Sequence, residues 1–547
     1  MENVILTISS IIVPLLVLVR PLVACKKDGI KALFENYRYE LGLTAILICG
    51  FLLRSVMLGT YPGGLNQDEA SIGYEAFSIL NSGVDRNGVP FPVHLISWGS
   101  GQNAFYAYLC IPFIKLFGLT TFAIRLPMCV VGCLSIFVFS CILKTLWGKK
   151  TALIGTIVFA LNPWHIMKSR WALESNIFPD LILIGVWFLV VWLIQGKKFG
   201  LYFSAILLGL SAYAYGTAYF FLPVFCVILF AGLLIKKKVK LLDVVIYIAI
   251  IFVVSLPIII FVIINRTDIG SIEIFGITIP KLFYNRQEQL MNFDNGFFKT
   301  VWTNIVNGLK LLVVQTDTLP WNSMQFFGTT CVATLPFLVL GIVRSFLKKD
   351  ICDSVFSAWL VTSLIIMAFV DANINRLNVI WIPMIYFVGK GMLFLIEMFP
   401  KIKIAILASV VCLGIAFSGY YFGNEYQNYM SYCFNDGYLN AIEYVENKKC
   451  EDIVVTNGME SPYITVLFQT QMSSEQYLES REIWNEHGAF EQVSKLGKYS
   501  FEEIDMNNLR KNKCYIVSYY DLTEEMKKDS DYLVTYFNYL AVVEKIK

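Results

Sequence analysis

The chain has 547 residues, of which 56% are hydrophobic and only 16% are charged. An average soluble protein is roughly a quarter charged and just under half apolar, so this composition has too much apolar surface for a soluble core. It excludes disordered, collagen-like and small disulfide-rich proteins, and it indicates a polytopic membrane protein with a soluble part.

The net charge of +3 is the sum of two parts of opposite sign. Residues 424–547 carry a net charge of −9, and the residues before them carry +12. The basic residues of the first part are dispersed in short pairs between apolar runs, a pattern that does not favour nucleic-acid binding. We therefore predict a basic transmembrane domain over residues 40–423 and an acidic soluble domain over residues 424–547.

About 20 apolar residues cross a bilayer, and twelve apolar runs are candidates for doing so. The first run has neither a basic start nor a small-residue cleavage site, so it is not typical of a signal peptide. We interpret residues 1–39 as an extra N-terminal span followed by a cytoplasmic loop. The twelve predicted spans lie near residues 3–23, 40–59, 122–146, 151–166, 177–195, 201–216, 217–235, 242–264, 326–346, 354–371, 377–399 and 404–423.

Lysine pairs or clusters occur in every second loop between these runs. Because loops rich in Lys and Arg stay in the cytoplasm, the domain 424–547 is predicted to lie outside the cytoplasm of a multi-pass cell-membrane protein. The outer loops are then 60–121, 167–176, 265–325 and 372–376. The lysines are Lys26-Lys27, Lys149-Lys150, Lys197-Lys198, Lys236-Lys237-Lys238, Lys348-Lys349, Lys401 and Lys403.

Two helices are predicted within the outer loops. The run 104–119 is short and contains Pro112 and Lys115, so we interpret it as a juxtamembrane or re-entrant helix. In the loop 265–325, apolar residues recur at helical spacing, which predicts an amphipathic helix on the membrane surface. These residues are Phe298, Val301, Trp302, Ile305, Leu309 and Leu312.

The tail has the pattern of a small α/β domain. Its three cysteines, Cys433, Cys450 and Cys514, allow at most one disulfide, and we do not expect one. Asp529 and Asp531 have the D-x-D spacing of a metal site, but they stand in a charged stretch that is typical of a solvated loop. Helices are predicted over 436–448 and 462–468, and strands over 452–456, 513–519 and 532–543.

The first outer loop contains the acidic pair Asp68-Glu69 just beyond a span, at the start of a predicted helix. Adjacent helical residues point about 100° apart, so the two carboxylates cannot share one role. One interpretation is structural, with Asp68 as the helix cap and Glu69 favouring the helix dipole. The other interpretation is catalytic, with one carboxylate acting as a general base.

Polar clusters also mark the second and last outer loops. Arg170 and Glu174 are four residues apart, which predicts an ion pair on one helix face, and His165 is expected to be an interfacial polar residue. Arg376 and Asn378 stand in a dense polar segment where two spans meet the outer face. Arg can hold a phosphate with two hydrogen bonds, so Arg376, with Arg170 and Asn378, is a candidate anion site.

These motifs together resemble the membrane glycosyltransferases of the GT-C superfamily. The resemblance is strongest to the family-39-like group, with protein O-mannosyltransferases and lipid A aminoarabinose transferases as relatives. It extends over residues 40–400, where the motifs stand in the same order. They are Asp68-Glu69, Phe117-Gly118, Arg125-Leu126-Pro127, Asn162-Pro163-Trp164, Ser169-Arg170 through Glu174, and Arg376 with Pro383.

The resemblance implies a polytopic α-helical fold, a polyprenyl-phosphate-linked sugar as donor, and inverting transfer on the extracytoplasmic face. It implies that Asp68 is the base or its close partner, with Glu69 beside it as a further catalytic candidate. Glu174 matches the acid of the second loop, and Arg376 matches the residue near the donor phosphate. The acceptor would be a glycan, a glycolipid or a protein; a divalent metal is possible, but the sequence offers no metal site.

One departure from the family concerns the first outer loop. The aminoarabinose transferases carry Lys-Pro-Pro ahead of their juxtamembrane aromatic run, whereas here Gln102 and Asn103 precede Phe105-Tyr106. Gln102, Asn103, Tyr106 and His94 are the candidate substrate-binding residues of this loop. The alternatives to an enzyme are a transporter or flippase for lipid-linked glycans, and a non-catalytic binder of them.

Overall fold

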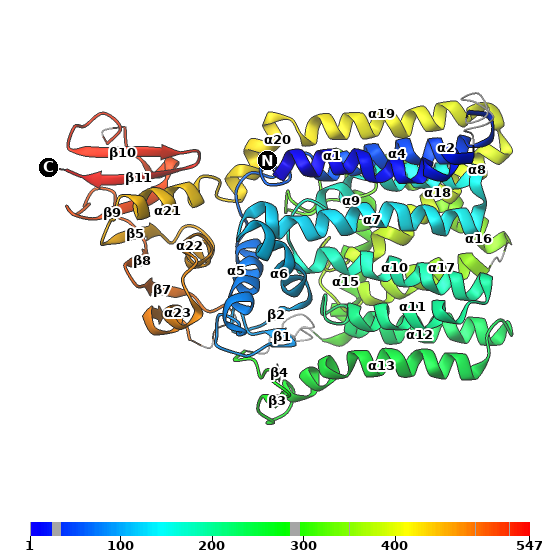
Figure 1. The fold of residues 1–547 in the computed structure, drawn as a ribbon, viewed down its shortest axis with the longest axis horizontal. Helices are drawn as coiled ribbons and strands as arrows, with labels where there is room; N and C mark the ends of the chain where they lie inside the picture. The colour runs from blue at the N-terminus through cyan, green and yellow to red at the C-terminus, as the bar shows by residue number, and fades with distance from the viewer. Residues whose placement is uncertain are drawn as a thin grey trace.

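The structure is a computed structural model that describes residues 2–24, 34–284, 296–348, 351–486, 488, 490–524 and 526–546. A bundle of long helices forms one part, and an α/β domain forms the other (Figure 1). Between them lies a layer of short helices and loops that contains α5 and α6. Lys26, Lys27 and Lys349, which belong to the predicted cytoplasmic loops, lie outside the described residues.

Each of the twelve predicted runs falls on helix. In the described residues, seven helical segments are long and apolar enough to cross a membrane, namely 2–24, 121–147, 174–195, 218–235, 241–264, 378–398 and 400–421. Twelve spans therefore remain a prediction. The bundle helices are α1 (Glu2–Leu15), η1 (Leu16–Leu18), α2 (Val19–Ala24), α4 (Arg38–Ser55), α7 (Thr121–Trp147), α8 (Lys149–Ala160), α10 (Glu174–Gln195), α11 (Lys198–Ser211), α12 (Ala218–Ile235), α13 (Leu241–Ile264), η2 (Val332–Thr334), α16 (Leu335–Lys348), α17 (Ile351–Met367), η3 (Asn378–Ile380), α18 (Trp381–Met398), η4 (Pro400–Ile402) and α19 (Lys403–Tyr421).

The basic loops gather at one end of the bundle. Lys149 at the start of α8 pairs with Glu40 at the start of α4 at 2.8 Å, and Lys198 pairs with Asp243 at the start of α13. The loop between α12 and α13 lies at the end of the bundle away from the α/β domain (Figure 1). The described lysines of these loops thus lie at the same end of the bundle.

The layer between the bundle and the α/β domain contains α5 (Gln67–Ser82), β1 (His94–Leu95), β2 (Gln102–Asn103) and α6 (Phe105–Phe117), and the short helix α9 (Pro163–Lys168) packs against the bundle helices α4, α7 and α8. The predicted helix in 104–119 is confirmed as α6. The apolar run 151–166 is divided between α8 and α9, because Asn162 caps α9 through the His165 amide at 2.9 Å and Pro163 occupies its first turn. Proline at the first helical position favours a new start over a continued helix.

The predicted amphipathic helix is confirmed as α15 (Phe297–Val314), which follows the hairpin of β3 (Ile272–Ile274) and β4 (Ile277–Ile279). Phe298 and Trp302 are 86% and 67% exposed, whereas Asn304 is buried. Asn304 donates a hydrogen bond to the Ala368 carbonyl at 3.3 Å. Phe298, Trp302 and Leu309 of the apolar stripe therefore face away from the protein, as expected for a helix in contact with lipid, whereas Leu312 packs against the core.

The C-terminal domain contains a seven-stranded sheet with the order β10-β11-β9-β5-β8-β7-β6. Strand β5 is parallel to both of its neighbours, β8 and β9, and the other pairs are antiparallel. The predicted helices and the strands over 452–456 and 513–519 are confirmed, whereas the run 532–543 is divided between two antiparallel strands, β10 and β11. The elements are α20 (Asn424–Cys433), α21 (Tyr438–Asn447), β5 (Ile453–Thr456), α22 (Pro462–Thr470), α23 (Ser474–Ser480), β6 (Arg481–Ile483), β7 (Val493–Leu496), β8 (Tyr499–Glu502), β9 (Cys514–Ser518), η5 (Tyr519–Asp521), β10 (Tyr532–Phe537) and β11 (Leu540–Lys545).

A disulfide joins Cys450 to Cys514, so the expectation of a disulfide-free tail is wrong. Cys450 precedes β5, and Cys514 begins β9. Because these two strands are parallel neighbours, their starts lie side by side. The sequence separation of 64 residues concealed this proximity.

The α/β domain is fixed to the first outer loop by several contacts. The Tyr74 hydroxyl of α5 donates to the Met472 carbonyl at 2.7 Å, and the Leu65 amide donates to the Phe434 carbonyl at 2.8 Å. Figure 1 shows α5 between the bundle and this domain. The start of α5, with its acidic pair, therefore lies where the two parts of the molecule meet.

Candidate active site

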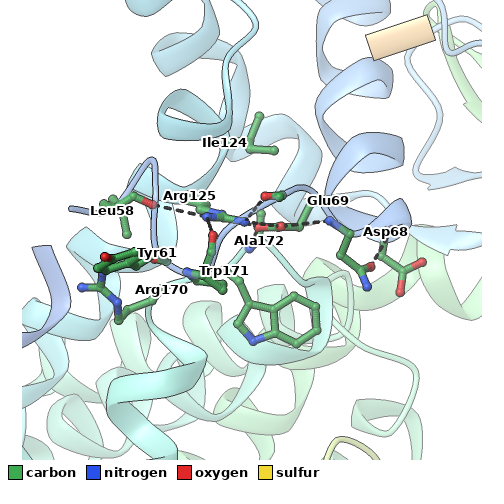
Figure 2. A network of polar contacts seen from close by, with 12 residues as sticks. Leu58, Tyr61, Asp68, Glu69, Ile124, Arg125, Arg170, Trp171 and Ala172 are labelled. Atoms are coloured by element: carbon green, nitrogen blue, oxygen red, sulfur yellow. Dashed lines mark hydrogen bonds and ion pairs between the residues drawn. The ribbon is translucent and has the colours of Figure 1, made fainter. Parts of the chain in front are cut away.

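The start of α5 is capped by Asn66. Its side-chain oxygen accepts a hydrogen bond from the Asp68 amide at 2.9 Å, and Glu69 closes a capping box with it. The interpretation of Asp68 as the helix cap is therefore wrong. The Asp68 side chain is partly exposed and points away from Glu69 in Figure 2. It stands in the first helical turn, where the helix dipole favours an anion.

Glu69 is fully buried and pairs with Arg125 of α7 in a two-pronged arrangement (Figure 2). Arg125 Nε donates to Glu69 Oε1 at 2.8 Å, and Nη2 donates to Oε2 at 2.7 Å. The Ala172 amide also donates to Oε1 at 2.8 Å. Both oxygens of Glu69 therefore accept hydrogen bonds from buried partners, and its catalytic role stays a prediction. Its carboxylate connects α5, α7 and the loop that leads to α10.

Arg170 is also fully buried. Its guanidinium donates to the carbonyls of Leu53 at 3.0 Å and Val56 at 2.7 Å, and it lies 4.9 Å from the centre of the Phe422 ring. It thus holds the segment after α4. The predicted helical pair with Glu174 is wrong, because α9 ends at Lys168 and α10 begins only at Glu174. A contact of Arg170 with the donor phosphate stays a prediction.

Glu174 is the first residue of α10. Its Oε1 accepts a hydrogen bond from the Asn103 amide at 3.2 Å. Its Oε2 is buried and has no hydrogen-bond partner among the described residues. Glu174 also interacts electrostatically with Asp68. The two carboxylates stand at the starts of two different helices, α10 and α5.

Gln102 and Asn103 reach this site from β2. Asn103 contacts Glu174 as described, and Gln102 also interacts with it. The side-chain oxygen of Gln102 accepts from Ser71 Oγ at 3.0 Å and from Ser97 Oγ at 3.2 Å. These bonds leave the side chain of Gln102 with a single orientation. Both residues were candidate substrate-binding residues, and the structure brings them together with Glu174.

His94 and Tyr106 are less suited to contact a substrate. The His94 ring is 7% exposed and stacks on Phe261 with 4.2 Å between ring centres. Burial lowers the pKa of His94 to about 4, so the ring is neutral at pH 7. The Tyr106 hydroxyl donates to the Ile124 carbonyl at 2.9 Å and accepts from the Met128 amide at 3.2 Å, which ties α6 to α7.

A second ionic cluster lies behind Gln102. Ser97 Oγ donates to Glu75 Oε1 at 2.9 Å, and Arg86 Nε lies 3.2 Å from the same oxygen. Burial raises the pKa of Glu75. Burial, with Glu75 nearby, also raises the pKa of Asp85 to about 7. The cluster supports Gln102 from behind, and it was not foreseen from the sequence.

The last outer loop contributes Arg376 and Asn378. Arg376 Nη1 pairs with Asp371 Oδ2 at 2.9 Å, and its side chain is 31% exposed. Asn378 is buried, and its amide donates to the Ser175 carbonyl, next to Glu174. Asp317 Oδ2 accepts from the Ile374 amide at 3.1 Å and so fixes the loop from the other side. The polar segment that contains Arg376 and Asn378 thus lies next to the start of α10.

Four buried charged or ionisable residues form a network that the sequence reasoning missed as a unit. Arg54 Nη2 lies 2.7 Å from His165 Nδ1, and His165 Nε2 lies 3.1 Å from Asp180 Oδ1. Lys168 Nζ pairs with Asp180 Oδ2 at 2.6 Å. His165 is therefore a buried residue and not an interfacial one. The signal was present, because Arg54 and Asp180 are ionisable residues inside apolar runs, which are rare and paired.

No group of three or more His, Cys, Asp or Glu side chains in the described part of the chain is arranged to hold a metal ion. The pair at the centre of the site consists of Asp68 and Glu174. Their surroundings are amides and hydroxyls. The site can therefore take a proton from a hydroxyl and hold polar groups in place by hydrogen bonds.

No protein-family model and no curated protein sequence matches the chain. Its fold is similar to that of ArnT from Cupriavidus metallidurans bound to undecaprenyl phosphate, with a TM-score of 0.51 and 12% identity over 92% of this chain and 97% of that one. The structure of ArnT in the apo state has a TM-score of 0.50 and 11% sequence identity, again over 92% of this chain and 97% of that one.

A second similar structure is the Archaeoglobus fulgidus oligosaccharyltransferase in the apo form. Its TM-score is 0.50 and its identity 12%, over 81% of this chain and 65% of that one. The chain thus shares the fold of ArnT and of this oligosaccharyltransferase, a fold that agrees with the polytopic helical architecture expected from the sequence resemblance.

Proposed function

We propose that the protein is an inverting glycosyltransferase that moves a sugar from a polyprenyl-phosphate donor to an acceptor hydroxyl on the extracytoplasmic side of the cell membrane. The observation that carries the proposal is the electrostatic interaction between Asp68, in the first turn of α5, and Glu174, the first residue of α10 beside Asn103. The fold supports it, because ArnT, which was solved with undecaprenyl phosphate, has the same architecture.

Asp68 is the proposed general base. It takes the proton of the acceptor hydroxyl while that oxygen forms a bond to the anomeric carbon. The bond from the same carbon to the phosphate oxygen breaks, and the polyprenyl phosphate leaves with the electron pair. Attack from the face opposite the leaving group inverts the anomeric centre. General base catalysis of this kind contributes about 10²–10⁴-fold.

Glu174 and Asn103 are the proposed substrate-positioning pair. Asn103 fixes one carboxylate oxygen of Glu174. The other oxygen is available for a hydrogen bond from a sugar hydroxyl, because it has no partner among the described residues. A buried hydrogen-bond acceptor is costly to leave unpaired, so a hydrogen bond from a sugar hydroxyl to this oxygen would stabilise the bound substrate.

Arg376 is the proposed contact for the leaving phosphate, with Asn378 positioning its loop. Asn378 ties the loop to Ser175, beside Glu174. Arg376 is partly exposed, and its partner Asp371 is 72% exposed. An exposed ion pair is weak, so a phosphate can replace Asp371. A guanidinium then stabilises the charge that develops on the leaving group.

An apolar cavity of about 480 Å³ between α12 and α13 suits the isoprenoid chain of the donor. Leu222, Cys226 and Ile251 are among its lining residues, as is Tyr219. The Tyr219 hydroxyl is buried without a hydrogen-bond partner among the described residues, and it interacts electrostatically with Glu174. Tyr219 thus belongs to the lining of the cavity and also interacts with Glu174.

Two observations support the extracytoplasmic side. The basic loops gather at the end of the bundle opposite the α/β domain, as described above, and basic loops stay in the cytoplasm. The disulfide Cys450–Cys514 lies in the α/β domain, and disulfides persist in oxidising compartments outside the cytoplasm.

A transporter or flippase is the second candidate. Such proteins hold their substrates near the bilayer midplane between broken helices. Here Asp68 and Glu174 stand at helix starts, and Asp180 lies six residues into α10, about 9 Å along it at 1.5 Å per residue. These positions near one end of the helices favour an enzyme over a transporter. The carboxylates of Asp68 and Glu174 favour an enzyme over a non-catalytic binder.

The Arg376 assignment predicts a loss of donor binding. Arg376→Ala should weaken binding of undecaprenyl phosphate by roughly 10–100-fold, the size of a hydrogen bond to a charged group. Arg376→Lys should restore only part of it, because Lys keeps the charge and loses the fork. Thermal-shift titration of the purified protein in detergent measures both.

Asp371→Asn is the matched control for Arg376. It removes the competing carboxylate and keeps the loop, so undecaprenyl phosphate should bind equally well or more tightly. Unchanged affinity in the Arg376→Ala variant would remove Arg376 from the donor site.

The proposed function is tested by mass spectrometry of polyprenyl-phosphate sugars and surface glycans in cells with and without the gene. Loss of the gene should lead to accumulation of one lipid-linked sugar, together with loss of that sugar from one class of glycan, glycolipid or glycoprotein. Identical profiles in the two strains would refute the proposed transferase activity.

A further inference from the structure

A second cavity, of about 550 Å³, lies between the start of α5, α20 and the sheet of the α/β domain. Asn66 and Gln67 line it from α5, and Tyr432 lines it from α20. The α/β domain contributes Tyr520 and Asp521, among others. Gln67 directly precedes the proposed base, Asp68, in the first turn of α5, so the cavity and the base share this turn.

The cavity lies at the position of the sheet where ligands commonly bind in α/β domains. It is lined by Thr456, the last residue of β5, and by Ser518, the last residue of β9. These strands are parallel neighbours, and the chain passes from β5 to β8 on one side before it returns to β9 on the other. Open α/β sheets bind ligands outside the carboxyl ends of their strands, where the strand order reverses.

Three tyrosines form an aromatic group at the mouth of this cavity. The ring centres of Tyr432 and Tyr520 are 5.9 Å apart with an interplanar angle of 77°. Those of Tyr432 and Tyr539 are 5.8 Å apart at 73°. Tyr432 and Tyr520 are 52% and 66% exposed. The face of an aromatic ring is negative, so it attracts the polarised C–H groups of a sugar ring.

The remaining polar groups of the cavity are two carboxylates and several amides. Glu460 and Asp521 are exposed acids, and Gln67 and Asn435 provide amide donors and acceptors. Carboxylates accept hydrogen bonds from hydroxyls, whereas they repel another acid. Gln67 also donates to Glu460, which ties the cavity wall of the α/β domain to the start of α5.

We propose that this cavity binds the acceptor as a carbohydrate chain without acidic groups, and so presents its end to Asp68. The three tyrosines pack against the faces of the sugar rings, and the carboxylates and amides form hydrogen bonds with the sugar hydroxyls. This inference rests on the proposed transferase function, and it gives the acceptor class and a role for the α/β domain. A protein acceptor would not need an aromatic group of this kind.

The test is saturation-transfer NMR with the full-length protein in detergent. The probes are chitotetraose, mannotetraose and cellotetraose, with tetragalacturonate as the acidic counterpart. At least one uncharged tetrasaccharide should bind, and tetragalacturonate should not. Tyr520→Ala should weaken binding by roughly fivefold to tenfold, the loss expected for one ring contact, and Asp521→Asn should weaken it as well.

Tyr536→Ala is the matched control. Tyr536 is a half-exposed tyrosine of the same domain that lies outside the cavity lining, so its loss should leave tetrasaccharide binding unchanged. The proposal is overturned if none of the uncharged tetrasaccharides binds, or if Tyr520→Ala binds them as well as the wild type does.

The Asp68→Asn variant separates this proposal from the proposed function. It should bind the tetrasaccharide normally, because Asp68 lies beside the cavity and does not line it. Intact donor consumption with no tetrasaccharide binding would overturn the acceptor site alone. Normal tetrasaccharide binding in a protein that consumes no lipid-linked sugar would overturn the transferase alone.

Discussion

Asp68→Asn should reduce sugar transfer by about 10²–10⁴-fold while the protein stays folded and still binds undecaprenyl phosphate. An amide cannot take up a proton near neutral pH, so the variant loses the base and keeps the shape of the side chain. Capping does not confound the result, because Asn66 caps α5. Turnover of the lipid-linked donor and binding of undecaprenyl phosphate are measured on the same preparation.

Asp268→Asn is the matched control, since Asp268 is an exposed acid of another outer loop. It should retain wild-type turnover. Near-normal turnover in the Asp68→Asn protein would contradict the catalytic role, and Glu174 would then become the candidate base.

Glu69→Gln should have the largest effect on folding. It removes the charge that Arg125 faces in a fully buried pair. Breaking one partner of such a pair costs about 3–5 kcal/mol, because the other charge stays buried without compensation. Arg125→Lys should also destabilise the protein, because Lys cannot make the two-pronged contact. Unfolding in mixed micelles, followed by circular dichroism, measures the loss.

Two further variants make this prediction specific. Glu425→Gln, at an exposed position, should leave the unfolding midpoint unchanged. The double variant of Glu69→Gln with Arg125→Gln should cost less than the sum of the two single changes, because the residues interact directly. Additive losses, or a Glu69→Gln protein as stable as the wild type, would show that the pair does not hold the three segments together.

Much of the fold was predictable because apolar runs and helical periodicity depend on local sequence. α15 illustrates this, since its apolar residues recur at helical spacing and the helix runs from Phe297 to Val314. The break between α8 and α9 was missed, although Asn162 and Pro163 gave a local signal for it. The disulfide depends on strand order, which joins Cys450 to Cys514 only after the sheet has formed.

The contacts of the candidate site residues were only partly predictable. Glu174 and Asn103 were both selected from the sequence, and the structure places them in contact. Glu69 could not be told from Asp68, because its partner Arg125 is 56 residues away along the chain. For the same reason Arg170 was predicted to pair with a neighbour in sequence, whereas it bonds to the carbonyls of Leu53 and Val56 at the end of α4.

One measurement tests the central claim most directly. Cells that lack the gene receive either the wild-type gene or the Asp68→Asn variant at equal protein levels, and their polyprenyl-phosphate sugars are quantified by mass spectrometry. The account predicts that the wild type clears one lipid-linked sugar, whereas the Asp68→Asn variant lets it accumulate as in the empty strain. Equal clearance by the two proteins would contradict transfer through Asp68, and no accumulation in any strain would contradict a lipid-linked donor.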